Sequence, residues 1–255
     1  MAGMLADKNI LVTGVLLESS IAFHAAKLAQ EQGANVILTA YGRVSLVERI
    51  AKRLPKPVPV VELDVSDRAQ LDSLATRVGQ YAEELDGVVH SIGASPSDTL
   101  GGNFLHAPWD SVAQALHVSA YSFASLSSAC LPLMRKGGSI VGIDFDSSLA
   151  WPDYDWMGVA KASLESVSRY LARYLGAQSI RVNLVASGPI RTMASRSIPS
   201  FDAFVDIWEK RSPIHWDEND PVPTAKAVVA LLSDWFPATT GEIVHVDAGL
   251  HAVGA

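Results

Sequence analysis

The chain has a single cysteine in 255 residues, so it cannot form an internal disulfide, which fits a reducing compartment. That residue, Cys130, lies in an apolar helical stretch, where a buried structural thiol is far more common than a reactive one. Lysine and arginine never cluster in groups of five or more, and the net charge is −7. Nucleic acid is therefore a poor candidate partner.

Long apolar runs and metal-ligand patterns are also missing. The apolar run over residues 10–17 is broken by Thr13 and Gly14, is too short to span a membrane, and is not followed by an Ala-x-Ala cleavage site. We therefore expect a soluble, cytoplasmic protein with no membrane partner. The seven histidines are scattered and no Cys/His group has metal-ligand spacing, so we predict no metal site.

What the sequence does have is apolar residues, 49% hydrophobic against 18% charged, which is ample for a large core. Apolar segments of strand length alternate with amphipathic segments of helical length. The predicted strands span residues 9–13, 35–39, 58–63, 87–90, 139–144, 181–186 and 242–246, and the predicted helices span 21–32, 44–54, 69–81, 111–133, 156–175 and 221–235.

Strands that are apolar on both faces and separated by helices are typical of a parallel sheet covered on two sides. We therefore predict an α/β fold: a Rossmann-type, doubly wound, parallel sheet of seven strands with helices on both faces and a ligand crevice at the carboxyl ends of the strands. No repeat or linker divides the chain, so residues 1–255 are predicted to form one domain. The irregular stretch 191–220 is either a mobile segment over a ligand site or an ordinary surface loop.

The first predicted strand runs into Gly14, and a helix opens at Ser20 and Ile21. Gly14 would let the backbone approach a dinucleotide, and the helix start would present free N–H groups to its pyrophosphate. The segment is not Gly-x-Gly-x-x-Gly, however, and a lone glycine after a strand is often only a turn.

Two further candidates follow the second and third strands. Asp64 could accept a hydrogen bond from an adenine amino group while Val65 lines the ring, or Asp64 could simply cap the next helix. Tyr41 and Gly42 stand where an NAD site often has an acidic residue. Arg43 could hold a 2′-phosphate, stack on adenine or be a solvated charge.

Turns after two other strands offer backbone contacts to the same ligand. Ser91, Ile92 and Gly93 follow the fourth strand, where Gly93 would allow close contact near a nicotinamide ribose. After the sixth strand, a Gly-Pro turn would let the Ile190 backbone hold a carboxamide and Thr192 reach a phosphate. The residues assigned to this second turn are Gly188, Pro189, Ile190 and Thr192.

The most informative pair is Tyr154 and Lys161, seven residues apart at the start of an apolar helix. A phenol beside a fixed ammonium can polarise a carbonyl. Standard short-chain dehydrogenases have Tyr-x-x-x-Lys, whereas this spacing covers about 10 Å along the helix axis. The longer spacing favours reduction of a carbon–carbon double bond next to a carbonyl. The alternative is an interface aromatic and a solvated lysine.

A cover for the substrate is predicted at residues 193–216, after the second cofactor turn. Within it a helix over 201–211 would place Phe201, Phe204, Val205 and Trp208 on one face. These side chains would cover an acyl chain, or they could be ordinary packing onto the sheet. Met157, in the first turn after Tyr154, is a further candidate for the substrate site.

Several segments together identify a family resemblance over nearly the whole chain: SSIAFH (19–24), LDGVVHSIG (85–93), GGSIVG (137–142), GPIRT (188–192) and LLSDW (231–235). The chain resembles the type I NADH-dependent enoyl-acyl-carrier-protein reductases of bacterial fatty-acid synthesis. It is most similar to the actinobacterial form, which includes the mycobacterial isoniazid-target enzyme.

The resemblance implies an NADH-dependent reduction of trans-2-enoyl thioesters carried on acyl carrier protein or CoA. It implies that Tyr154 donates its hydroxyl to the thioester carbonyl oxygen and that Lys161 holds the nicotinamide ribose. Phe145 stands where many relatives carry a second tyrosine, and it can only pack or orient. A homotetramer is also implied, with residues 111–133 and 156–175 as interface helices.

Two departures from the mycobacterial enzyme matter. Gly42 replaces an acidic residue, which bears on the choice between NADH and NADPH. The segment after Thr192 is shorter, which predicts a preference for short to medium acyl chains.

Two other functions remain open from the residues alone. A carbonyl-reducing short-chain dehydrogenase, such as a β-ketoacyl reductase, would need Tyr-x-x-x-Lys and a serine at the end of the fifth strand. That end has Asp144, Phe145 and Asp146, with serines only at 147 and 148. A dinucleotide-binding sensor would bind cofactor without turnover, which the intact Tyr154 and Lys161 argue against.

Overall fold

The computed structural model describes residues 3–254 and contains one sheet of seven parallel strands in the order β3-β2-β1-β4-β5-β6-β7. Every pairing along this order is parallel. The predicted doubly wound fold is therefore confirmed. The strands are β1 (Asn9–Val12), β2 (Asn35–Ala40), β3 (Val60–Glu62), β4 (Gly87–His90), β5 (Gly138–Asp144), β6 (Ile180–Ser187) and β7 (Ile243–Val246).

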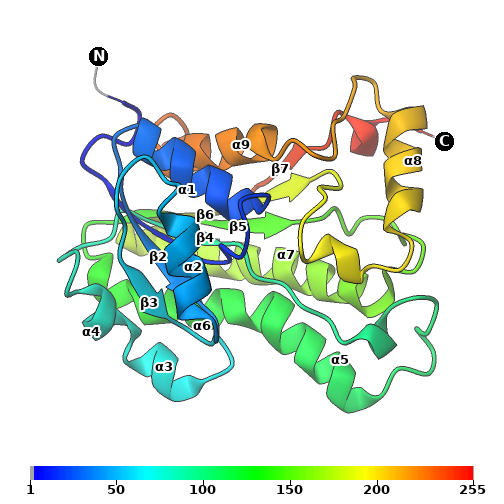
Figure 1. Cartoon of the computed structure of the whole chain (residues 1–255), viewed down its shortest axis with the longest axis horizontal. Helices are drawn as coiled ribbons and strands as arrows, with labels where there is room; N and C mark the ends of the chain where they lie inside the picture. Colours follow the sequence, from blue (N-terminus) through cyan, green and yellow to red (C-terminus); the bar gives the residue numbers. More distant parts are fainter. Residues whose placement is uncertain (1–2, 255) are drawn as a thin grey trace.

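Helices cover both faces of the sheet (Figure 1). On one side lie α1, α2 and α9, and on the other lie α4, α5, α6 and α7. The helices are α1 (Ile21–Glu31), α2 (Val44–Ala51), α3 (Arg68–Asp72), α4 (Leu74–Val78), α5 (Trp109–Leu116), α6 (Ser122–Cys130), α7 (Asp155–Leu175), α8 (Phe201–Arg211) and α9 (Val222–Leu232). Helix α8 lies apart from both layers, near one end of the molecule (Figure 1).

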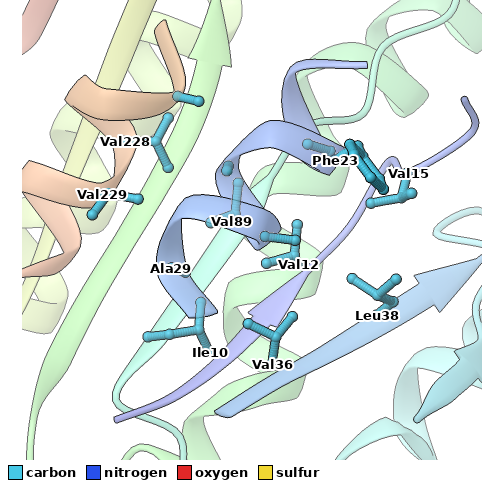
Figure 2. Close-up of a cluster of buried hydrophobic side chains, with 14 of the residues drawn as sticks. Ile10, Val12, Val15, Phe23, Ala29, Val36, Leu38, Val89, Val228 and Val229 are labelled. Carbon is cyan, nitrogen blue, oxygen red and sulfur yellow. The ribbon is translucent and has the colours of Figure 1, made fainter. Parts of the chain in front are cut away.

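Alternate residues along each strand supply two separate cores. Ile10 and Val12 of β1 pack with the α1 side, whereas Leu11 between them packs with the α6 and α7 side. Figure 2 shows the first core, where Val36 and Val89 from the neighbouring strands join Ile10 and Val12 beneath α1. Because both faces are buried, the strands are almost continuously apolar, as the sequence indicated.

The buried thiol of Cys130 belongs to the second core. Burial raises the pKa of this thiol to about 12, so it stays protonated at physiological pH. The expectation of a structural cysteine is confirmed.

Several predicted boundaries were wrong for local reasons. The helix over 69–81 is two short helices, because the Ser73 hydroxyl bonds back to the Ala69 carbonyl and α3 ends there. Strand β3 has three residues, not six, since Pro59 has no N–H for the ladder. Helix α2 stops at Ala51, shortly before Pro55.

The predicted helix over 111–133 contains a π-helical turn, His117–Tyr121, between α5 and α6. Ser119 lies in this turn, and its hydroxyl donates to the Ala94 carbonyl (2.9 Å) and accepts from the Ala94 N–H (3.0 Å). The turn therefore fixes the loop that follows β4. A 3₁₀ turn, Leu131–Leu133, ends the helical stretch at Pro132.

A third, smaller apolar cluster lies beyond the carboxyl ends of the central strands. It joins Tyr154, at the start of α7, to Phe204 and Trp208 of α8 and to Leu250 near the end of the chain. This cluster places α8 over the strand ends. Among residues 3–254, no helix is long and apolar enough to cross a lipid bilayer.

Candidate active site

The ends of β1 and β4 meet so closely that only glycine fits at position 14. A Cβ on Gly14 would lie 1.9 Å from the Ser91 carbonyl oxygen, and Gly14 has a φ of +85°. Thr13 fixes the junction, since its hydroxyl donates to the Val89 carbonyl (2.9 Å) and accepts from the Ser91 N–H (3.2 Å). The strand order reverses between β1 and β4, so this junction is the switch point where doubly wound sheets bind ligands.

Helix α1 begins beside this junction. Ser20 is its N-cap, accepting from the Phe23 N–H (3.4 Å), and Ile21 is its first residue. The helix end brings a positive dipole and free N–H groups to the switch point. A backbone cradle that a Cβ would fill, next to a helix N-terminus, fits the pyrophosphate of a dinucleotide.

Asp64 and Val65 follow β3, as predicted. Asp64 does not cap the next helix, because the N-cap of α3 is Asp67, whose carboxylate accepts from Ala69 and Gln70. The Asp64 carboxylate instead accepts from the Ser66 N–H (2.8 Å), and Val65 is buried. The helix-cap alternative for Asp64 is therefore excluded.

The segment after β2 lies open at the same edge of the sheet. Tyr41 is 67% exposed, Gly42 has a φ of +63°, and Arg43 is exposed at the start of α2 without a side-chain capping bond. A Cβ on Gly42 would meet nothing within 4 Å. Residues 41–43 are therefore exposed and make fewer packing contacts than the other predicted cofactor segments.

The turn after β6 lies directly beneath the predicted cover. A Cβ on Gly188 would lie 2.8 Å from Trp208 Nε1 and 2.8 Å from Trp216 Cε2, so a larger residue cannot fit. The Trp216 indole donates to the Pro189 carbonyl (2.8 Å). Ile190 is buried, and Thr192 exchanges hydrogen bonds with Ser195.

Lys161 lies in α7, almost fully buried against the end of β5. Its ammonium donates to the Ile143 carbonyl (2.9 Å) and lies 3.9 Å from Asp144 Oδ1. Burial lowers the pKa of Lys161, while Asp144 and Glu165 act to raise it. The alternative of a solvated helix charge is wrong for this lysine.

Asp144, the last residue of β5, is a buried carboxyl that the sequence analysis did not assign to the site. It is 2% exposed, and neither oxygen has a hydrogen-bond partner among the described residues. Burial raises its pKa to about 7, and the Lys161 charge partly offsets this. An acidic residue inside an apolar strand was the sequence signal for it.

Tyr154 is the N-cap residue of α7 and is 6% exposed. Its ring lies 5.2 Å from Phe145 and 6.0 Å from Phe204, measured between centroids. Burial, followed by the nearby Asp144 charge, raises the pKa of the phenol, so the hydroxyl stays protonated. Such a group can donate a hydrogen bond to a bound carbonyl oxygen.

Helix α8 spans Phe201–Arg211, matching the predicted segment, and turns the predicted face inward. Phe204 and Trp208 are buried and contact Phe145 with centroids 5.6 Å and 5.7 Å away. Phe201 is also buried, with the Arg191 guanidinium 5.3 Å from its ring, and Val205 is half-buried. Met157 packs against the same cluster.

The structure adds two aromatic side chains to the cluster formed by Phe145, Tyr154 and the buried face of α8. Trp151 contacts Phe145 (5.4 Å), Phe204 (5.9 Å) and Trp208 (5.2 Å), and its indole donates to the Asp146 carbonyl (2.7 Å). Trp216 covers the Gly188 turn, as described above. Neither tryptophan has a spacing signal in the sequence, because loops place both. Within residues 3–254, no group of three or more His, Cys, Asp or Glu could hold a metal ion.

Comparison with known proteins gives consistent matches over the whole chain. A family model described as enoyl-(acyl carrier protein) reductase matches residues 14–251. The chain is 50% identical over 263 positions to a Mycolicibacterium smegmatis protein named enoyl-acyl-carrier-protein reductase (NADH), covering 98% of both chains.

More distant relatives carry similar names. An Escherichia coli enoyl-acyl-carrier-protein reductase (NADH) is 34% identical, covering 97% of this chain and 95% of its own. A Staphylococcus aureus relative, named as the NADPH form, is 33% identical and covers 98% of each chain.

Proposed function

The chain belongs to the enoyl-(acyl carrier protein) reductase family, and from this premise we propose that it reduces the trans-2 double bond of enoyl thioesters with NADH in bacterial type II fatty-acid elongation. One observation carries the proposal beyond the family match. A protonated, buried Tyr154 lies beside Phe145 under an apolar cover, seven residues before a buried Lys161. That arrangement suits a substrate with a polar carbonyl and an apolar tail.

Bound NADH would supply the hydride for the β-carbon of the enoyl thioester. The chain itself would hold the thioester carbonyl oxygen through the Tyr154 hydroxyl, which stabilises the negative charge that develops there. Because burial keeps this phenol protonated, the donor is present across the physiological pH range. Phe145 has no hydroxyl, and its role is to hold the Tyr154 ring in place.

Lys161 would hold the ribose hydroxyls of the cofactor. Its bond to the Ile143 carbonyl fixes the ammonium against β5, so little side-chain freedom remains to be lost on binding. The remaining cofactor contacts would come from the edge of the sheet. They are Gly14, Ser20, Ile21, Tyr41, Asp64, Val65, Ser91, Ile92, Gly93, Gly188, Pro189, Ile190 and Thr192.

The acyl chain would lie against Met157 and the buried face of α8, formed by Phe201, Phe204 and Trp208. Phe204 and Trp208 already pack in one cluster with Phe145 and Tyr154, so the cover excludes water from the carbonyl oxygen. Water exclusion strengthens the hydrogen bond from Tyr154, because the local dielectric is low.

The proposal includes a carrier and an assembly. The substrate would be carried on acyl carrier protein or CoA, and the chain would act as a single reductase domain in the cytoplasm. A homotetramer is expected, with α5, α6 and α7 at its interfaces. Exposed aromatic residues on these helices and the π-helical turn, Tyr121, Tyr170 and Tyr174, support that expectation.

The test is NADH oxidation by the purified enzyme with crotonyl and octenoyl thioesters, run beside a β-ketoacyl thioester. We expect turnover with the enoyl substrates and none with the β-ketoacyl substrate. Turnover of the β-ketoacyl thioester alone would indicate a carbonyl reductase. NADH binding without turnover of any substrate would indicate a dinucleotide sensor.

A further inference from the structure

The two residues on either side of Tyr154 have an unusual backbone conformation. Asp153 has a φ of +58° and Asp155 a φ of +39°. Side chains other than glycine rarely adopt positive φ, although Asp and Asn tolerate it better than most. Tyr154 between them has an ordinary φ of −86°. Strain of this kind persists only where surrounding contacts enforce it, and it concentrates at functional sites.

Contacts with one glycine turn hold both aspartates. The Gly102 N–H donates to Asp155 Oδ2 (2.7 Å), and the Gly101 N–H donates to the Asp153 carbonyl (3.0 Å). Both glycines have positive φ themselves, +74° and +84°. The turn at Gly101 and Gly102 therefore fixes the backbone before and after Tyr154.

Asp153 also connects Tyr154 to the cover. Its carboxylate accepts a hydrogen bond from the hydroxyl of Ser200, the N-cap residue of α8. Pro199, next to Ser200, would lie 3.3 Å from a Cβ on Gly101. The glycine turn, the Tyr154 backbone and the start of the cover thus meet at one place.

We propose that Asp153 and Asp155 are positioning residues for Tyr154. Their enforced backbone conformation sets where the Tyr154 hydroxyl lies, and the bond from Asp153 to Ser200 couples that position to the placement of α8. This inference rests on the proposed reductase function. The competing role for Asp155 is only that of an acidic residue stabilising the first turn of α7.

Three substitutions of Asp155 separate these roles. Asp155→Ala introduces a residue that tolerates positive φ less well than aspartate does, and it removes the hydrogen bond from the Gly102 N–H. Asp155→Gly allows the positive φ but removes the hydrogen bond from Gly102. Asp155→Asn keeps an acceptor oxygen for that hydrogen bond and also tolerates the positive φ. The matched control is Asp7→Ala, the same exchange at an exposed aspartate with a φ of +61° in the N-terminal segment.

The measurements are kcat and KM with an enoyl thioester, NADH affinity by fluorescence, and the melting temperature. We expect Asp155→Ala to lower kcat by about 10- to 100-fold with NADH affinity unchanged, because small misplacement of a reacting group is costly. Asp155→Gly should give an intermediate loss. Asp155→Asn should restore kcat to within about threefold of wild type, and Asp7→Ala should lose only thermal stability.

The inference is overturned if Asp155→Ala keeps wild-type kcat, or if all Asp155 variants lose kcat and NADH affinity in proportion to their melting temperatures. A wild-type enzyme inactive on every enoyl thioester would instead overturn the proposed function, which is a separate result.

The link to the cover has its own test, a double-variant cycle with Asp153→Gly and Ser200→Ala. If the two side chains act through their shared bond, removing both should cost no more kcat/KM than removing the one whose single substitution is more damaging. Additive losses would show that Asp153 and Ser200 act independently and would refute the coupling.

Discussion

Replacing Asp144 by asparagine tests the electrostatics of the buried pair that Asp144 forms with Lys161, the lysine proposed to hold the cofactor. Among residues 3–254 the Asp144 carboxyl oxygens have no hydrogen-bond partner, and Lys161 Nζ lies 3.9 Å from Oδ1. Asparagine has nearly the same shape and does not titrate. Comparing the two proteins across pH therefore isolates the contribution of this one carboxyl to stability.

The magnitude follows from the pKa values. The unfolded chain has the model value of 3.8, and burial raises the pKa of Asp144 to about 7 in the fold. Between these values the native state holds a proton that the unfolded state has lost. The free energy of unfolding thus falls as pH rises, by up to about 1.4 kcal/mol per pH unit. Below the unfolded pKa this proton makes its full contribution to the free energy of unfolding. About 2 kcal/mol of that contribution is lost between pH 5 and pH 7.

The assay is urea unfolding followed by far-UV circular dichroism, without NADH, at pH 5, 6, 7 and 8 and at one protomer concentration. We expect the wild type to lose about 2 kcal/mol relative to Asp144→Asn between pH 5 and pH 7. Parallel curves would refute the reasoning, because they would mean that Asp144 is ionised throughout as the partner of Lys161. A pKa that Lys161 lowers below the model value of 3.8 would give the same parallel curves, because the carboxyl would then be ionised in both states above pH 5.

Four further predictions concern the proposed activity. Tyr154→Phe removes the donor and should lower turnover by about 10- to 1000-fold with NADH affinity kept; unchanged turnover would exclude Tyr154 from the mechanism. Lys161→Ala should weaken NADH binding by roughly 1.5–3 kcal/mol, measured by fluorescence titration, and normal affinity would contradict its role. The enzyme should prefer NADH to NADPH in kcat/KM, and a preference for NADPH that disappears in Arg43→Ala would show that Arg43 holds a phosphate. Across enoyl thioesters from four to sixteen carbons, kcat/KM should rise at about 0.8 kcal/mol per buried methylene and then level off; a continued rise to the longest chains would mean that the cover does not limit the pocket.

The sequence predicted the parts of the molecule that depend on local periodicity. The alternation of apolar strands and amphipathic helices predicted the seven-stranded parallel sheet, and the spacing of Phe201, Phe204 and Trp208 predicted the buried face of α8. The glycine after β1 also came from local pattern, and the closeness of Ser91 explains why no other residue fits there.

The features that the sequence did not predict depend on contacts between distant segments. The positive φ of Asp153 and Asp155 is enforced by Gly101 and Gly102, about fifty residues earlier in the chain. Trp151 joins the aromatic cluster of Phe145, Phe204 and Trp208 only because a loop brings it against α8. No local propensity encodes such contacts, so they emerge only from the assembled fold.

The π-helical turn at His117–Tyr121 restricts how this chain can evolve in length. A π-helical turn holds one residue more than the α-helical turn it replaces, and here that geometry brings Ser119 to the backbone of Ala94. Deleting one residue from this turn would leave an ordinary α-helical turn and take the Ser119 hydroxyl away from the Ala94 backbone. The packing of α5 on α7 and of Phe123 and Leu126 in the core would be kept. The extra residue of this turn is therefore what attaches the loop after β4 to the helix, and a chain without it would keep its core but lose that attachment.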